Sequence, residues 1–419
     1  MIEKIKDVFQ KGYICDSCAG RIVAELLSGM TNAERGNIIR HYVAMMIDAG
    51  EKLDVDMSNF YGIKLRNVKI ESSKPGKCKV CKNFFFEEID KVAERAAEKL
   101  KEIEFDNFLV GTIVPGEMVK NEELLWNEAG IEFVEPIKSE INRELGKRIE
   151  KLTKKKFKLD NPDVMIIADI DKDSIRLQMR SLFISGGYKK LVRGIPQTKW
   201  ICWKCKGKGC KACAGEGKLY KTSVQEEIEK PLIKATKSKK SKFHGAGRED
   251  IDARCLDYRP FVIELVRPLK RKINLQKLAR SINKSKKAKV SKLRFADKDY
   301  VRKIKTDRYE KTYLADVTFE KPIDKKKAKL IKQIVGEILQ QTPQRVVHRR
   351  ADKLRRRKVK SISVKTIGRS KMQLKIRAES GLYIKELVSG DNGRTRQNIA
   401  DILGNKVKKI NLDLIKIHK

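Results

Sequence analysis

A short glycine-flanked segment of this chain places carboxylates where they could do chemistry. Residues 245–254 read Gly-Ala-Gly-Arg-Glu-Asp-Ile-Asp-Ala-Arg, and Asp250 ends a Gly-Arg-x-Asp sequence. A carboxylate presented by such a loop can act as a nucleophile or as a general base. Asp252 is the alternative carboxylate, and Asp250 is preferred because it directly ends the motif. A glycine-flanked acidic loop is by itself most often a turn, so this interpretation depends on the rest of the chain.

Eight of the nine cysteines fall into Cys-x-x-Cys pairs. In a reduced compartment such pairs are typical of thiolate metal ligands rather than of disulfides. Two such turns supply the four thiolates of a tetrahedral structural zinc site. A redox dithiol is the alternative, but neither pair of the first quartet lies in a strand-then-helix setting. That quartet, whose pairs are separated by a helical insertion including residues 21–49, is Cys15, Cys18, Cys78 and Cys81.

The second quartet is a tandem repeat of Cys-x-x-Cys-x-Gly-x-Gly, with the candidate ligands Cys202, Cys205, Cys210 and Cys213. Its glycines permit the positive φ angles that turn backbone amides toward sulfur. We expect a structural zinc here that rigidifies a junction, which gives one or two zinc ions and no organic cofactor for the chain. A phosphate-binding loop is the alternative, but no Gly-Lys-Ser/Thr follows these glycines. Cys255 is unpaired and is expected to be a buried apolar residue.

The positive charge of the chain is concentrated in its second half. The 419 residues carry a formal net charge of +41, and residues 221–419 hold 56 Lys/Arg against 22 Asp/Glu. Residues 1–220 hold 40 against 33. A single lysine run is usually a solvated face, but several runs between apolar segments can neutralise phosphates and release counterions. Nucleic acid is therefore the expected partner.

Length and hydropathy give the class and the expected location. With 40% hydrophobic residues the chain can bury large cores, and its length predicts about two to four domains. The mixed charges of residues 1–7 do not resemble a secretory signal, and no apolar run approaches the roughly 20 residues of a membrane span. We expect a cytoplasmic protein that does not associate with membranes.

Hydrophobic periodicity predicts an α+β chain. Before the second quartet, helical faces recur in 86–104 and 137–152, and residues 164–168 and 175–179 indicate two strands joined by a turn. After the quartet, the pattern predicts helices packed on a mixed sheet. The expected strands of this later part are 260–265, 313–319 and 372–377, and its expected helices are about 326–340 and 384–387.

Other enzyme classes lack their signatures. The Ser-Gly-Gly at 185–187 lacks the aspartate of an ATP-binding loop, which argues against nucleotide activation. A methyltransferase or a thiolation enzyme would need a glycine-rich cofactor loop or an ATP loop, and neither is evident. A serine or cysteine hydrolase is disfavoured because no histidine has an evident nucleophile partner. The four histidines are His41, His244, His348 and His418.

Three segments of the chain resemble the active-site motifs of pseudouridine synthases and occur in the expected order. They are Gly247–Asp250, the strand-like segment that begins at Tyr313, and Tyr383–Leu387. Over essentially its whole length the chain is similar to the archaeal THUMP-containing tRNA pseudouridine synthases that act on positions 54 and 55 of the T-arm. The further segments that carry this likeness are 15–21, 31–36, 181–184, 190–200, 342–346, 348–352 and 389–395.

The resemblance implies a THUMP-containing RNA-binding region followed by a pseudouridine synthase fold. In the family a glycine-containing loop tends to precede Arg-Pro-Phe, whereas here residues 255–258 lead directly into it, so the geometry of this loop is left open. The implied domains are a zinc-binding module at 1–83, the THUMP-containing region at 84–200, the second zinc ribbon at 201–218 and the catalytic domain at 219–419.

The resemblance also implies a role for each site residue. Asp250 would be the catalytic carboxylate, and Lys385 would supply the neighbouring charge that keeps it ionised. Tyr313 would stack on the flipped uracil, Tyr383 would form a wall that contacts the base, and Arg248 would bind substrate. Whether the carboxylate attacks C1′ or C6, or removes a sugar proton, is left open.

The expected function is thus isomerisation of uridine to pseudouridine in the T-arm of tRNA, at position 54, position 55 or both. The expected partner is tRNA, with no obligate protein partner evident. The alternative is a zinc-ribbon tRNA-binding protein without catalytic activity. The two differ in whether purified protein converts uridine or only binds the RNA.

Overall fold

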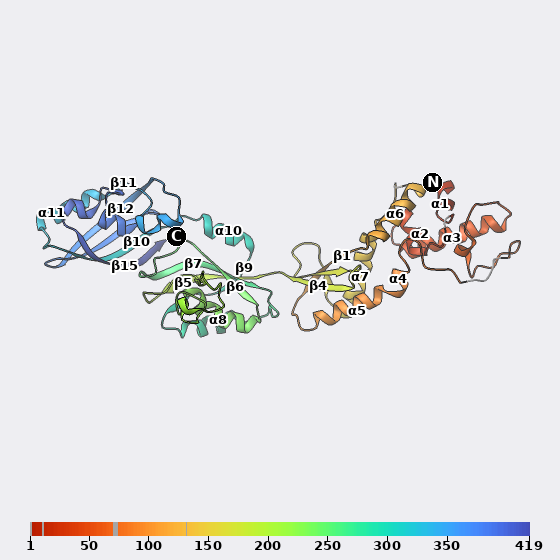
Figure 1. Ribbon diagram of the computed structural model, residues 1–419, viewed down its shortest axis with the longest axis horizontal. Coiled ribbons are helices and arrows are strands. Elements are labelled where there is room, and N and C mark those ends of the chain that lie inside the picture. The colour runs from red at the N-terminus through yellow and green to blue at the C-terminus, as the bar shows by residue number, and fades with distance from the viewer. Residues whose placement is uncertain (1, 11, 70–73, 131) are drawn as a thin grey trace. The chain divides into compact units, whose positions relative to one another are not determined.

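The computed structural model describes residues 2–10, 12–69, 74–130 and 132–419 (Figure 1). Contacts divide the chain into a first unit, Met1–Arg180, and a second unit, Ser181–Lys419. The division predicted from the sequence has four parts, and its finer borders stay a prediction. None of the helices in the described ranges is long and apolar enough to cross a membrane.

The first unit contains a four-stranded sheet in the order β2-β1-β3-β4. β1 is parallel to β2 and β3, and β3 and β4 form the antiparallel hairpin predicted from the sequence. The helices α5 and α7 pack on each other and against this sheet, with apolar faces close to those predicted. The bounds are β1 Asn107–Ile113, β2 Lys156–Phe157, β3 Val164–Asp169, β4 Ser174–Met179, α5 Ile89–Leu100 and α7 Ile137–Thr153.

The remaining helices of the first unit surround the first cysteine quartet. Thr31 begins α3 with a capping box, in which its side chain accepts from the Glu34 amide and the Glu34 carboxylate accepts from the Thr31 amide. Two reciprocal bonds of this kind satisfy free donors at a helix start. The bounds are α1 Ile2–Asp7, α2 Asp16–Gly20, η1 Arg21–Val23, α3 Asn32–Asp48, η2 Met57–Phe60, α4 Phe84–Glu87 and α6 Gly116–Ala129.

Two glycines let α2 and α3 touch through their backbones. A Cβ atom added at Gly20 would lie 1.8 Å from the carbonyl oxygen of Asn32, and one at Gly36 would lie 1.9 Å from that of Asp16. No side chain fits at such distances, and the neighbouring atoms belong to the backbone and cannot rotate away. The glycine that ends the 31–36 segment is thus explained by close helix packing.

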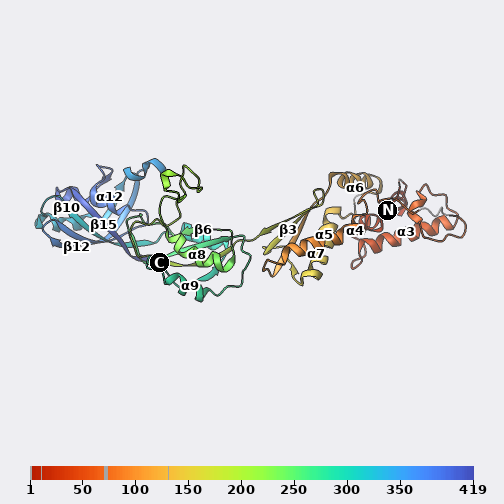
Figure 2. The same cartoon turned by 60° about the horizontal axis from the view of Figure 1, so that its bottom comes forward.

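The second unit is built on a mixed sheet of 11 strands in the described part (Figures 1 and 2). Its order is β14-β11-β12-β13-β10-β15-β7-β5-β8, with β6 beside β7 and β9 beside β5. β15 and β7 are parallel, and the other pairs are antiparallel. The bounds are β5 Leu182–Lys190, β6 Lys240–Gly245, β7 Arg254–Val266, β8 Ala288–Val290, β9 Arg294–Ala296, β10 Glu310–Phe319, β11 Gly336–Gln340, β12 Arg355–Gly368, β13 Lys371–Ala378, β14 Thr395–Arg396 and β15 Val407–His418.

Helices cover this sheet over two apolar cores. One core joins α8 and α9 to β5, β7 and β8, and the other joins α11, α12 and α13 to β10–β13 and β15. The strands predicted at 260–265, 313–319 and 372–377 and the helix at 384–387 are confirmed. The helix bounds are α8 Val224–Thr236, α9 Leu275–Asn283, α10 Lys298–Thr306, α11 Lys325–Leu330, α12 Ile384–Ser389 and α13 Ile399–Leu403.

The helix predicted at about 326–340 is wrong in its second half. Helical structure ends with the 3-10 turn η4, Ile331–Ile334, and β11 follows from Gly336, whose φ is +132°. β11 pairs with both β12 and β14, so Ile338 is a buried strand residue and not a helix residue. Short apolar runs fit either period, and here pairing within the sheet decides.

Two glycine-to-alanine substitutions, one at the contact between α2 and α3 and one in α7, should have opposite effects on stability. Gly36→Ala should lower the free energy of unfolding by about 1–3 kcal/mol or more, because the added methyl group has no space. Gly146→Ala in α7 is the matched control, since its Cβ would meet only Phe157 at 3.6 Å. It should raise stability by roughly 0.5–1 kcal/mol. Denaturant unfolding measures both, and a Gly36→Ala chain as stable as wild type would contradict the close packing.

Candidate functional site

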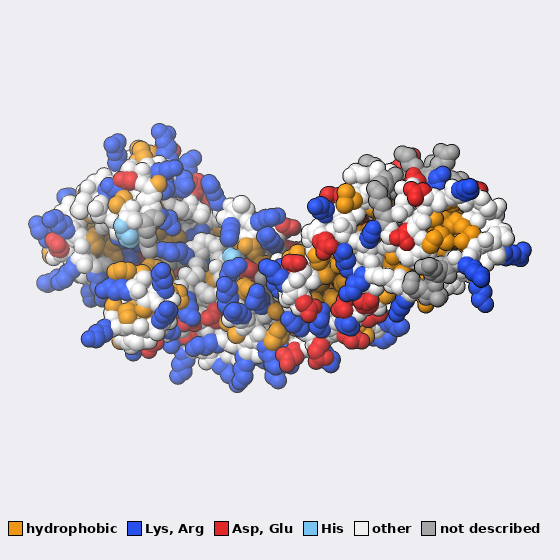
Figure 3. Space-filling model, turned by 45° about the vertical axis from the view of Figure 1, so that its right-hand side comes forward, with side chains coloured by type: hydrophobic (Ala, Val, Ile, Leu, Met, Phe, Trp, Pro, Cys, Tyr) orange, Lys and Arg blue, Asp and Glu red, His pale blue; other side chains and the backbone are white. Residues whose placement is uncertain are grey.

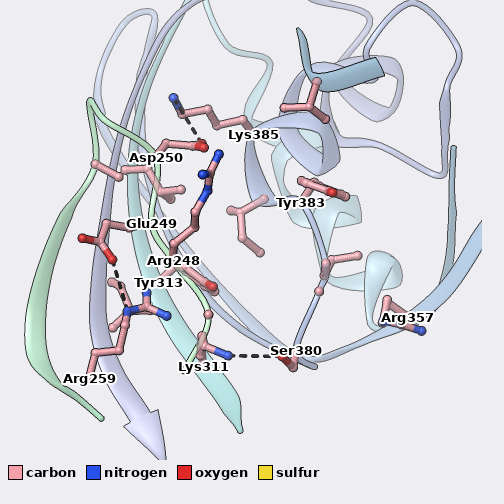
Figure 4. A pocket seen from close by; sticks show the side chains of 18 of the residues that line it. Arg248, Glu249, Asp250, Arg259, Lys311, Tyr313, Arg357, Ser380, Tyr383 and Lys385 are labelled. Carbon is pink, nitrogen blue, oxygen red and sulfur yellow. Dashed lines mark hydrogen bonds and ion pairs between the residues drawn. The ribbon is translucent and has the colours of Figure 1, made fainter. Parts of the chain in front are cut away.

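The five residues predicted for the active site line one cavity of about 280 Å³ (Figure 4). Arg248 and Asp250 come from the loop between β6 and β7. Tyr313 lies in β10, and Tyr383 and Lys385 lie at the start of α12. The strand order explains why these residues lie close together, because β7, β15 and β10 are successive neighbours in the sheet. The structure thus brings these residues together, and their roles stay predictions.

Arg345 makes the closest ion pair with Asp250. Its Nη1 atom lies 2.9 Å from Asp250 Oδ1, while its Nε atom lies 2.6 Å from Glu386 Oε1. Burial opposes the charge of Arg345, but Glu386 and Asp250 outweigh it and raise the pKa of the guanidinium. A permanent cation therefore contacts the Asp250 carboxylate. The sequence analysis noted the 342–346 segment but did not identify Arg345 as a site residue.

Lys385 interacts mainly with Asp252. Its Nζ atom lies 2.6 and 2.7 Å from the two Asp252 oxygens, and 3.7 Å from Asp250 Oδ2. Burial works against ionisation of Asp252, but the Lys385 ammonium lowers the pKa of this carboxyl overall. The Asp252 side chain is 61% exposed, compared with 31% for Asp250. Of the two candidate carboxylates, Asp250 is thus the more buried, and Asp252 is the one that Lys385 hydrogen-bonds.

A buried lysine fixes the backbone of the loop that carries Asp250. Lys190 is fully buried at the end of β5, and burial lowers the pKa of its ammonium. Its Nζ atom donates to the carbonyl oxygens of Ile195, Asp250 and Ile251 at 3.0, 2.9 and 3.1 Å. Further donors from the same segment are Arg193, to the Asp252 carbonyl at 2.8 Å, and Gln197, to the Gly247 carbonyl at 2.9 Å. The 190–197 segment therefore holds the loop at several points.

Glu249 anchors the loop from within. Its Oε2 atom lies 3.1 Å from Arg259 Nε and accepts a hydrogen bond from the Tyr188 hydroxyl at 2.8 Å (Figure 4). The Arg259 guanidinium also donates to the carbonyl of Ala246 at 3.0 Å. Both members of the Glu249–Arg259 pair are almost completely buried. A buried ion pair of this kind strongly constrains its surroundings, because removing one partner leaves an uncompensated charge.

Two tyrosines form aromatic parts of the cavity wall. Tyr313 lies beside a register shift between β10 and β15, and burial raises its pKa to about 12, so its hydroxyl stays neutral at pH 7. Tyr383 caps α12, and Gln340 holds both its backbone N–H and its carbonyl, at 2.9 and 2.8 Å. The Tyr383 hydroxyl accepts from Arg350 Nη1 at 2.9 Å. These rings are positioned by backbone contacts and can offer flat surfaces to a planar base.

Cations make up much of the remaining cavity wall. Lys311 is one of them, and burial together with the nearby Arg259 guanidinium lowers its pKa to about 8. The sequence alone did not predict these residues as part of the site, because nothing in their spacing distinguishes them from the many other basic residues. A wall of this composition suits a polyanion with a flat base. The further cations are Arg254, Arg259, Lys311, Arg350, Arg355 and Arg357.

Both cysteine quartets are arranged to hold a metal ion. In each quartet the four sulfur atoms lie within 4.8 Å of one another. In the first, Arg21 Nη1 lies 3.3 Å from Cys18 Sγ. In the second, the amides of Gly209 and Gly217 donate to sulfur at 3.2 Å, from positive φ angles of 92° and 68°. The prediction that these glycines turn amides toward sulfur is confirmed, and such donors stabilise thiolates.

Family models match most of the chain. The model described as "Pus10, C-terminal" matches residues 183–418, and "Pus10 THUMP domain, archaeal" matches residues 92–169. A relative from Methanothrix thermoacetophila named tRNA pseudouridine synthase Pus10 is 41% identical, over 98% of this chain and 93% of its own length. A relative of the same name from Archaeoglobus fulgidus is 42% identical over 81% of this chain and 95% of its own length.

Among solved structures, a Cbf5-Nop10-Gar1 complex is similar at 18% identity, with a TM-score of 0.28 over 55% of this chain and 48% of that one. The relative from Methanothrix thermoacetophila aligns with 98% of this chain, whereas this structure aligns with 55% of it.

The cysteine geometry predicts a metal content. Chain purified without a chelator should contain close to two metal ions, one for each quartet. Cys210→Ser and Cys78→Ser should each reduce this to about one, because three thiolates bind a structural metal far more weakly than four. Elemental analysis by mass spectrometry measures the ratio, with Cys255→Ser as the control that leaves it unchanged. Metal-free wild-type chain would refute both sites.

Proposed function

The chain belongs to the Pus10 family of tRNA pseudouridine synthases, and from this membership we propose that it isomerises uridine in the T-arm of tRNA with Asp250 as the catalytic carboxylate. The chain is accordingly an isomerase that acts on RNA. The proposed target is position 54, position 55 or both. The observation that carries the proposal is the convergence of Asp250, Tyr313 and the start of α12 on one cavity.

The reaction needs no oxidant, reductant or co-reactant. The bond from N1 to C1′ breaks, the uracil turns while it stays bound, and C5 forms the new bond to C1′. The C5 proton then leaves, and N1 carries a proton in the product. A carboxylate can assist as nucleophile at C1′ or C6, or as the base that removes a sugar proton. All three routes require an ionised carboxylate.

The surroundings of Asp250 support this role. Arg345 contacts Oδ1 and Lys385 lies near Oδ2, so two cations lie beside the carboxylate. Neither cation interacts with Asp250 alone. Arg345 also forms an ion pair with Glu386, and Lys385 also forms one with Asp252. The positive charge is therefore fixed in place by other carboxylates, and it does not neutralise Asp250 completely. Such a fixed arrangement costs little reorganisation during a reaction.

The aromatic residues support binding of an extruded base. A uridine inside a folded RNA loop must leave its stack before an enzyme can reach C1′, which costs a few kcal/mol. Stacking on an aromatic ring recovers about 1–3 kcal/mol. Tyr313 is the proposed stacking surface, Tyr383 the proposed second wall and Arg248 a proposed phosphate or base contact.

The charge of the second unit supports tRNA as the partner. Residues 181–419 hold 65 Lys/Arg against 23 Asp/Glu, whereas residues 1–180 hold 31 against 32. On the face in Figure 3, blue side chains gather over the second unit, and red ones are more frequent over the first. The second unit should therefore provide most of the binding free energy that comes from counterion release from tRNA. The matched THUMP domain supports RNA binding by the first unit.

The metal in both quartets is proposed to be structural zinc. Four thiolates without an open position are typical of structural zinc and leave no site for a substrate. The metal would hold the chain turns in place and takes no part in the isomerisation. The free cysteines of these quartets and a tRNA substrate also support the proposed cytoplasmic location.

Asp250→Asn tests the catalytic assignment. It keeps the size of the side chain and removes the charge, so turnover should fall by roughly 10²–10⁴-fold or more. Binding of tRNA should change by no more than about threefold, because phosphate contacts dominate affinity. Asp252→Asn is the matched control and should cost at most about fivefold, as expected for an exposed ion pair.

Mass-spectrometric mapping of pseudouridine in an unmodified tRNA transcript measures this, with affinity measured on the same preparations. Product from Asp250→Asn at the wild-type rate would refute the assignment. Intact wild-type chain that binds tRNA and forms no pseudouridine would favour the non-catalytic RNA-binding alternative.

Lys190→Met tests how the loop is positioned. The substitution removes three hydrogen bonds to loop carbonyls and should lower the turnover number by about 10²-fold, since small displacements of a reacting group have effects of this size. The KM for tRNA should stay nearly constant, because Lys190 is buried. Lys189→Met on the same strand is the control, since Lys189 lies over the Tyr258 ring instead. A raised KM with an unchanged turnover number would contradict a positioning role.

A further inference from the structure

The second cysteine quartet carries an exposed tryptophan. The Trp203 side chain is 72% exposed, although the adjacent Cys202 is almost completely buried. The ammonium of Lys204 lies 5.3 Å from the centre of the indole ring. Ile201 and Leu219, which flank the quartet, are also about half exposed. Large apolar side chains gathered on a surface usually mark a binding site.

The sequence on both sides of this tryptophan is rich in lysine and contains almost no compensating acid. Residues 199–221 contain seven lysines and one acidic residue, Glu216. Lys218 is bound to Glu226 at 2.8 Å, and the other six are exposed. The cores of protein–protein interfaces are depleted of lysine, whereas single-stranded RNA is bound by aromatic rings set among cations. The charge therefore favours RNA over a protein as the ligand. The six are Lys199, Lys204, Lys206, Lys208, Lys211 and Lys221.

The backbone below the tryptophan is held rigidly. A Cβ atom at Gly209 would lie 2.6 Å from the carbonyl oxygen of Gly215, and one at Gly217 would lie 2.4 Å from that of Gly207. The two halves of the repeat thus touch through their main chains, and their four sulfur atoms lie within 4.8 Å of one another. A ligand that binds here orders little additional chain, and this lowers the entropic cost of binding.

The tryptophan also lies close in sequence to a wall of the reaction site. A second cavity, of about 220 Å³, is bordered on one side by Asp250, Arg345 and Lys385. Its other side is formed by Pro196, Gln197, Thr198 and Trp200, directly before the quartet. Figure 2 shows the quartet in yellow-green, projecting from the body of the second unit. The quartet therefore begins two residues after a residue that lines this cavity.

We propose that residues 201–219 form an RNA-binding platform, on which an unpaired base of the substrate stacks against Trp203 while the surrounding lysines bind the flanking phosphates. This inference rests on the proposed function, since it takes tRNA as the ligand. It gives the second quartet a role in substrate binding in addition to the rigidity expected from the sequence.

Trp203→Ala tests the platform. Stacking of one base corresponds to roughly 5- to 100-fold in affinity, so the Kd for an unmodified tRNA transcript should rise by that factor. The turnover number at saturating tRNA should change little, because Trp203 does not line the cavity around Asp250. Trp203→Phe should restore most of the affinity. Phe86→Ala, at an aromatic residue of the first unit that is 60% exposed, should have no effect.

A blunt RNA duplex without unpaired bases serves as the second ligand. Wild type and Trp203→Ala should bind it equally, since a paired base cannot stack on the indole. Lys208→Gln should reduce the slope of log Kd against log salt for tRNA by about one. This variant keeps the tryptophan and all four cysteines, so it tests the surface even if Trp203→Ala loses its metal.

The outcomes separate this inference from the proposed function. Equal tRNA affinities of wild type and metal-loaded Trp203→Ala, with an unchanged salt slope for Lys208→Gln, would overturn the platform and favour a protein ligand. Equal losses of affinity for tRNA and for the duplex would also overturn it, because stacking would not be involved. Wild type that makes no pseudouridine yet binds tRNA through Trp203 would contradict the proposed function alone.

Discussion

The hydrogen bonds of the buried Lys190 ammonium are the contacts on which the proposed reaction site depends. Taking a lysine out of water costs several kcal/mol, and here three carbonyl oxygens compensate it. Two of these oxygens belong to Asp250 and Ile251, in a loop that leaves the sheet and cannot satisfy its carbonyls through strand pairing. An apolar side chain would fill the same space and leave them unpaired. The position of Asp250 is therefore set by β5, a strand more than 50 residues earlier in the chain.

The distribution of charge assigns different tasks to the two units. The second unit holds nearly all of the excess of basic over acidic residues, while the first is close to neutral. Net charge would therefore attract RNA to the unit that holds the proposed reaction site, and this attraction would weaken as salt is added. Whatever the first unit contributes to binding has to come from local contacts and shape. Recognition by shape is the usual mode for folded RNA.

The sequence predicted the local features well and the long-range ones poorly. The eight paired cysteines and the hairpin of β3 and β4 follow from spacing and periodicity. The gathering of three motifs, which are far apart in the chain, was expected only from the resemblance to pseudouridine synthases. The contact of Arg345 with Asp250 does not, because the two are 95 residues apart and the segment offers many arginines. The helix predicted over 326–340 failed for a related reason. Its apolar residues suit both periods, and only the partner strands β12 and β14 make the second half a strand.

Two carboxylates lie two residues apart in the loop, and their surroundings separate their properties. Both Asp252 oxygens are engaged by Lys385 at hydrogen-bonding distance, which leaves this group little free electron density. Asp250 uses only Oδ1, toward Arg345, while its Oδ2 lies 3.7 Å from the Lys385 ammonium, beyond a hydrogen bond. An oxygen that lies near a cation but beyond hydrogen-bonding distance keeps its lone pairs available. A nucleophile or a base needs such lone pairs, and this difference supports the proposal of Asp250 rather than Asp252 as the catalytic carboxylate.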